Sequence, residues 1–106
     1  MTDKIVVLST CASAEQAEGI SRTLVEKRLA ACVNVLAGAR SIYRWQGAIE
    51  EASECLLIIK SRSDLAAELR AEIERLHSYE VPEVLVLPVV GGSAGYLGWM
   101  DRELRA

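Results

Sequence analysis

Apolar residues occupy every position of three short segments, 5–8, 56–59 and 84–87. Uninterrupted runs of this length, rich in valine, isoleucine and leucine, are typical of strands rather than of amphipathic helices. We therefore predict strands at 4–10 (KIVVLST), in the third quarter of the chain up to Lys60, and at 83–90 (EVLVLPVV). Pro88 lies in the last of these, and a proline inside a strand indicates a sheet edge or a bulge.

Two other segments show apolar residues at the spacing of a helix. The first begins with the capping pattern S-A-E-Q at Ser13 and is predicted to run to about Ala31. The second begins near Ser63 or Asp64 and places His77 in its last turn. A third, short helix is predicted after Ser93, which is suited to cap it.

The thirty residues from Cys32 to Ser61 read as two strands of one long hairpin. Gln46-Gly47 is the predicted turn, because a tight hairpin needs a positive φ that glycine accepts. Gly38 predicts a bulge in the first arm. Residues 41, 43 and 45 would then share one face of the ribbon.

The order strand, helix, strand, strand, helix, strand, helix is the split βαβ pattern of a ferredoxin-like fold. We predict a single α+β domain over residues 1–106, a two-layer sandwich with an extended β-hairpin and a short C-terminal helix. Helices would cover one face of the sheet only, yet the strands are apolar on both faces. Because an exposed apolar face is unfavourable in a monomer, we predict a homo-oligomer.

Composition excludes several classes of function. The net charge of −3 provides no basic surface for nucleic acid or anionic lipid. The first apolar run is too short for a secretion signal, and no apolar stretch would span a membrane, so we expect a cytoplasmic protein. Three cysteines without a CxxC pair indicate neither a disulfide framework nor a zinc knuckle. No nucleophile, nucleotide or hydrolase motif is present, and an enzyme is not predicted.

Five segments together resemble the CutA divalent-cation tolerance family: A-A-C-V-N-V (30–35), S-I-Y-R-W-Q-G (41–47), E-C-L-L-I-I-K (54–60), H-S-Y-E-V-P-E-V (77–84) and Y-L-G-W-M (96–100). The resemblance implies ferredoxin-like subunits that form a homotrimer similar to the PII signalling proteins, with hairpins that pair between subunits. It also implies a role in tolerance of copper and other divalent cations, and no catalysed reaction.

The resemblance further implies a cation site built from a thiol at the end of the first strand and a histidine after the second helix. The histidine corresponds to His77, but Ser9 occupies the thiol position. Cys11 lies two residues on, so His77 and Cys11 are the predicted ligands for copper or another divalent cation. The alternative for His77 is a structural role, with its imidazole bonded to nearby backbone at the helix end.

Two further groups of residues are candidates. Glu50, Glu51 and Glu54 would suit a hard cation, but on a hairpin they are expected to be solvated surface. As an alternative function, a PII-like small-ligand sensor or trimeric scaffold would bind an anion or nucleotide in a cleft between subunits. The residues predicted to line that cleft are Trp45, Lys60, Tyr79 and Glu80.

Overall fold

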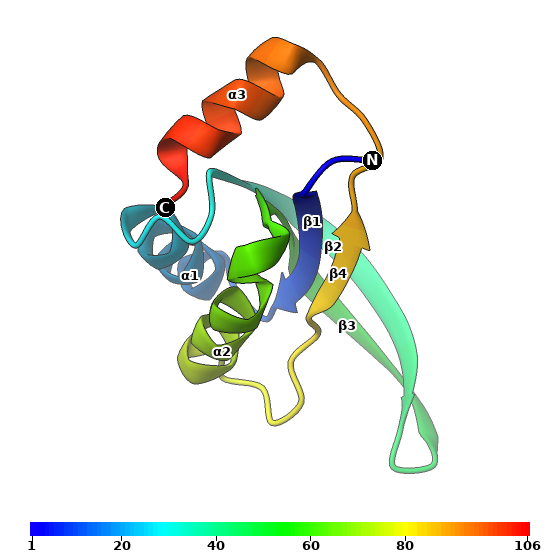
Figure 1. The fold of residues 1–106 in the computed structure, drawn as a ribbon. Coiled ribbons are helices and arrows are strands. Elements are labelled where there is room, and N and C mark those ends of the chain that lie inside the picture. The colour runs from blue at the N-terminus through cyan, green and yellow to red at the C-terminus, as the bar shows by residue number, and fades with distance from the viewer.

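A computed structural model describes all residues from 1 to 106 (Figure 1). Its elements, in chain order, are β1 (Lys4–Cys11), α1 (Ala14–Glu26), β2 (Cys32–Trp45), β3 (Ala48–Arg62), a 3-10 turn (Ser63–Leu65), α2 (Ala66–Leu76), β4 (Leu85–Pro88) and α3 (Ala94–Glu103). The four strands form one sheet in the order β2-β3-β1-β4, and every neighbouring pair is antiparallel. This is the ferredoxin-like arrangement that the element order predicts.

The helices lie on one side of the sheet, where α1 and α2 cover its face and α3 crosses one end (Figure 1). Alternate residues of β1 and β3 face this helical layer and are almost fully buried. They join apolar residues of all three helices in a single core, which includes Leu24, Leu69 and Met100. Burial of these side chains is the main source of stability for a sheet covered on one face.

The hairpin of β2 and β3 is the longest feature of the fold, with arms of 14 and 15 residues. Its turn is at Gln46 and Gly47, where φ is 50° and 83°, as a two-residue type I′ turn requires. Gly38 has φ 83° at the point where the pairing of β2 with β3 shifts register, which confirms the predicted bulge. Beyond the bulge the ribbon extends away from the rest of the sheet (Figure 1).

Both predicted helix caps are present. The Ser13 hydroxyl accepts a hydrogen bond from the Gln16 amide at 3.2 Å. The Ser93 hydroxyl accepts one from the Tyr96 amide at 3.4 Å. The end of the first helix was predicted wrongly, because α1 stops at Glu26 rather than at Ala31.

A Schellman motif ends α1 early. Arg28 adopts φ 57°, and the amides of Arg28 and Leu29 donate to the carbonyls of Val25 and Leu24 at 3.0 Å. The buried residues Leu29, Ala30 and Ala31 then continue into the core without helical geometry, which explains why their apolar pattern resembled helix.

The sheet face opposite the helices remains partly uncovered in the single chain. Strand β4 is an edge strand of four residues, shorter than predicted, and Pro88 is its last residue. Leu85, Val86 and Leu87 within it are 56%, 47% and 43% exposed. No helix in the structure combines the length and the apolar character needed to cross a membrane.

Candidate functional site

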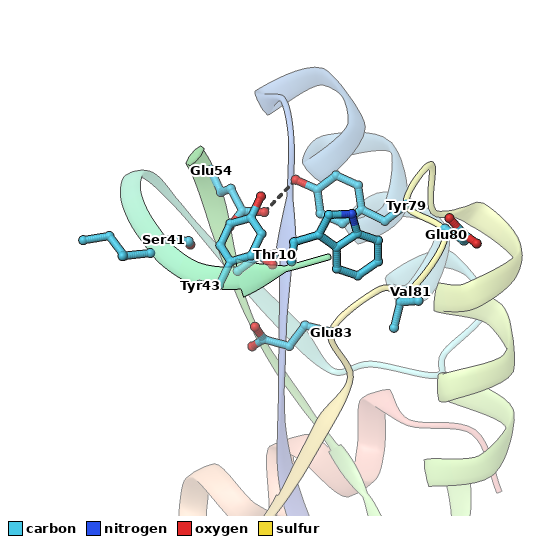
Figure 2. Close-up of a pocket in the computed structure, with 10 residues that line it drawn as sticks. Thr10, Ser41, Tyr43, Glu54, Tyr79, Glu80, Val81 and Glu83 are labelled. Carbon is cyan, nitrogen blue, oxygen red and sulfur yellow. Dashed lines mark hydrogen bonds between the residues drawn. The ribbon is translucent and has the colours of Figure 1, made fainter. Parts of the chain in front are cut away.

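A cleft of about 600 Å³ lies where the end of β1, the long hairpin and the segment after α2 meet (Figure 2). These three parts of the chain come together because β1 is paired with β3 and α2 returns the chain beside the end of β1. The residues that line the cleft are Thr10, Ser41, Ile42, Tyr43, Trp45, Glu54, Tyr79, Glu80, Val81 and Glu83.

Glu54 is the buried acid of this cleft. Its side chain belongs to β3, it is only 8% exposed, and its Oε2 accepts a hydrogen bond of 2.6 Å from the Tyr79 hydroxyl. Burial opposes ionisation, but hydrogen bonds from Ser41, Tyr79 and Thr10 outweigh it and lower the pKa of Glu54. The carboxylate is therefore charged at neutral pH.

This charge has no ionic partner. The ion pairs of the structure involve ten other acid–base combinations, and Glu54 belongs to none of them. Buried carboxylates are usually paired or bound to a metal, so an unpaired one facing a cleft is a candidate ligand.

The expectation that Glu54 is solvated hairpin surface was wrong. Glu51 does lie on the exposed ribbon, where it pairs with Arg40. Glu54 lies at the base of the ribbon instead, and Tyr79, 25 residues further along the chain, donates to its carboxylate. The alternation of side chains between the two faces of a strand could not predict this long-range contact.

His77 lies at the end of α2, one residue beyond its last helical position. Its Nε2 is 2.7 Å from the Thr10 carbonyl, and its Nδ1 accepts a hydrogen bond of 3.1 Å from the Tyr79 amide. This pattern fits the neutral imidazole that carries its proton on Nε2, because a carbonyl can only accept. Both nitrogens thus already have backbone partners, and the imidazole holds the Tyr79 segment against the end of β1.

Cys11 is fully buried at the end of β1 and belongs to the helix-facing core, whereas its neighbour Thr10 lines the cleft. Burial raises the pKa of Cys11 to about 11, with smaller contributions from Cys55 and Glu54, so the group is a neutral thiol at pH 7. Ser9, at the thiol position implied by the resemblance, is also fully buried, and its hydroxyl has no hydrogen-bond partner. Coordination of a cation by His77 and Cys11 remains a prediction.

Trp45, Tyr79 and Glu80 line this cleft within the single chain, while the cleft between subunits that they were predicted to line remains a prediction. Lys60 does not line it, since its ammonium group is bonded to the Asn34 side chain further along the sheet. In Figure 2, Glu54 and Glu80 lie on opposite sides of the Tyr79 ring, and Glu83 lies below them.

The cleft lining contains three glutamates and no lysine or arginine. The residues that this chain contributes therefore favour a cation, and the anion or nucleotide expected in a cleft between subunits remains a prediction. The side chains of histidine, cysteine, aspartate and glutamate do not gather in any group of three or more that is poised to hold a metal. A cation in the cleft would take Glu54 as its principal ligand, together with water or ligands from a neighbouring chain.

Comparison with known proteins gives one consistent result. The family model described as CutA1 divalent ion tolerance protein matches residues 5–103. The divalent-cation tolerance protein CutA of Pectobacterium atrosepticum is 42% identical over 105 residues, which cover 99% of this chain and 96% of that protein.

Solved structures agree with the sequence comparison. The CutA crystal structure from Xylella fastidiosa superposes with a TM-score of 0.96 at 41% identity, over 98% of this chain and 100% of that one. The divalent cation tolerance protein (Cut A1) from Thermus thermophilus gives a TM-score of 0.94 at 43% identity, over 96% and 99%.

Proposed function

The chain belongs to the CutA1 divalent ion tolerance protein family, and we propose that it binds divalent cations as a cytoplasmic homotrimer. The proposed function is binding rather than catalysis. Copper is the ion that we expect to bind most tightly, since Cu²⁺ exceeds the other first-row divalent ions in affinity for a given set of oxygen and nitrogen ligands.

One observation carries the proposal: the ionised, 8% exposed carboxylate of Glu54 faces a cleft without any ionic partner. A divalent ion would compensate this charge, and Glu80 and Glu83 would attract it to the opening. Tyr79 holds the carboxylate in place by its 2.6 Å hydrogen bond, as groups behind a metal ligand commonly do.

The trimer is supported by the apolar surface of the single chain. Besides β4, the exposed large apolar residues include Val35, Leu36, Ile42 and Ile49 of the long hairpin. Edge strands and overhanging apolar ribbons are stable in water when another chain pairs with them. A neighbouring hairpin would also close the cleft, whose lining includes the ribbon residues Tyr43 and Trp45.

Calorimetric titration of the trimer with Cu²⁺ tests the site. We expect Glu54→Gln to weaken binding by at least about 10- to 100-fold, since even a change in a group behind a metal ligand costs that much. Glu51→Gln is the matched control, because it removes the same charge from an exposed position of the same strand. Equal affinities for these two variants would contradict the proposal.

The same titration decides on the two ligands implied by the family resemblance. His77→Gln and Cys11→Ala would each lower the affinity for Cu²⁺ if these residues coordinate the ion. A loss with His77→Gln or Cys11→Ala but none with Glu54→Gln would move the site from the cleft to the end of β1.

A PII-like small-ligand sensor is the second candidate, and the aromatic lining of the cleft favours it. Tyr43, Trp45 and Tyr79 surround the acidic residues, a combination suited to an organic ammonium or guanidinium ion. A thermal-shift screen of small amines, nucleotides and organic acids separates the two functions. Stabilisation by an amine that rises with its concentration and disappears in Trp45→Ala would support the sensor.

A further inference from the structure

The two buried cysteines Cys11 and Cys55 face each other across the sheet. They are direct partners in the antiparallel register of β1 with β3, at the end where β1 stops. Both belong to the helix-facing core, with exposures of 0% and 6%. Both are free thiols, and the metal site that the family resemblance implies did not include Cys55.

We propose that Cys11 and Cys55 form a binding site for one soft monovalent cation, Cu(I) or Ag(I), held between the two sulfurs. The site is independent of the cleft, because Cys11 and Cys55 lie on the helical face of the sheet and Glu54 opens to the cleft. The proposal therefore does not rest on the proposed binding of divalent ions.

The donor set selects this class of ion. Thiolates favour soft ions, and zinc or iron–sulfur clusters normally require four ligands, which this position does not provide. Monovalent ions of the copper group accept two ligands in a line. Two thiolates are a complete coordination sphere for such an ion, so the pair needs no third protein ligand.

The spacing of opposed strand residues fits an ion better than a disulfide. Directly opposed side chains in an antiparallel pair have Cβ atoms about 4.5–5.5 Å apart. A disulfide requires a Cβ separation of about 3.5–4.5 Å, so the strands would have to approach each other. A linear ion with metal–sulfur bonds of about 2.3 Å, the length of zinc–thiolate bonds, separates the sulfurs by about 4.6 Å and the Cβ atoms by somewhat more, which corresponds to the wide end of the cross-strand range.

Loading the site is a proton exchange. Two S–H bonds break, two metal–sulfur bonds form, and two protons leave to solvent, while the oxidation state of the ion stays +1. The ion reaches the pair from the end of β1, where the exposed residues Ala12 and Ser13 follow Cys11.

Titration of the reduced protein with Ag⁺ in chloride-free buffer tests the proposal. We expect one tightly bound ion per chain, and at least a 100-fold loss of affinity in Cys11→Ala and in Cys55→Val. Cys32→Ala is the matched control, since Cys32 lies in β2 and is more exposed, and it should bind as the wild type does. Glu54→Gln should also bind Ag⁺ normally, which distinguishes this site from the cleft.

X-ray absorption at the silver edge of the loaded wild-type protein provides a readout that does not depend on variants. Two sulfur neighbours and no nitrogen or oxygen neighbour would support the site. The proposal would be overturned by undiminished Ag⁺ affinity in Cys55→Val, by a nitrogen ligand in the spectrum, or by a loss of Ag⁺ binding in Cys32→Ala. Thiol counting on protein purified without reductant would also overturn it if Cys11 and Cys55 were found joined as a disulfide.

Discussion

The Tyr79 hydroxyl and the Glu54 carboxylate lie 2.6 Å apart, joined by a hydrogen bond that spans 25 positions of the sequence. Through this contact the segment after α2 reaches the base of the long hairpin. It also keeps an ionised, nearly buried carboxylate directed at the cleft.

Removal of this bond is expected to weaken both the fold and the site. Tyr79→Phe should lower the free energy of unfolding by about 1.5–3 kcal/mol, the range for hydrogen bonds to charged groups, and should raise the pKa of Glu54. Chemical denaturation and NMR titration of the glutamate carboxyls measure the two effects. Tyr96→Phe is the control, because Tyr96 is 43% exposed. A comparable loss of stability in Tyr79→Phe and Tyr96→Phe would mean that the hydrogen bond to Glu54 does not stabilise the fold.

Acid should destabilise the fold through Glu72. Hydrogen bonds from Arg75 at 2.8 Å and from Lys27 at 2.6 Å lower the pKa of this carboxyl from its ordinary value of 4.5 to about 2. Because the folded-state pKa is the lower one, the stabilisation is complete above pH 4.5 and is lost as pH falls towards 2.

A pH series of unfolding temperatures tests this account of Glu72. Glu72→Gln should be less stable than wild type at pH 6, and the difference should shrink between pH 4.5 and 2. Glu74→Gln removes a charge from the same helix, where Glu74 pairs only with the exposed Arg70 at 3.5 Å, and should change little. A difference for Glu72→Gln that persists unchanged down to pH 2 would refute the ionic explanation.

The hairpin turn should respond in opposite directions to two neighbouring substitutions. Gly47→Ala adds a Cβ at a backbone position with φ 83° and should lower the free energy of unfolding by about 1–2 kcal/mol. Gln46→Asn should instead stabilise the protein, because asparagine tolerates φ 50° better and Asn-Gly is the preferred type I′ pair. Thermal unfolding of the two variants checks the signs, and a stabilising Gly47→Ala would exclude the type I′ turn.

Assembly should depend on the edge strand. Leu87→Glu on β4 is expected to prevent the trimer, whereas Val25→Glu on α1 should leave it intact, although both parent side chains are 43% exposed. Light scattering reports the particle mass relative to the 11.6 kDa chain. A trimer that survives Leu87→Glu would place the subunit contact elsewhere.

Local signals in the sequence predicted most of the fold. Ser13 and Ser93 cap helices, Gln46-Gly47 forms the hairpin turn, and Gly38 marks the bulge, because each of these depends on a few adjacent residues. The end of α1 was missed since Arg28, rather than a glycine, adopts the left-handed conformation that stops it.

The site was predictable only in part. The family resemblance directed attention to His77 and Tyr79, which do lie at the end of β1 beside the cleft. Glu54 was a candidate for a hard cation but was expected to be solvated, because its burial depends on a tyrosine far along the chain. The pairing of Cys11 with Cys55 was not predicted, because it is set by strand register. Contacts between distant segments carry no local pattern, so the chemistry that depends on them appeared only in the structure.

Anomalous diffraction at the copper edge, from crystals of the protein loaded with Cu²⁺, tests most directly whether Glu54 binds the ion. We expect one peak per chain in the cleft, within about 2.0–2.6 Å of a Glu54 carboxylate oxygen, the usual range for metal–oxygen bonds. A peak at another position, with the Glu54 carboxylate still unoccupied, would contradict it.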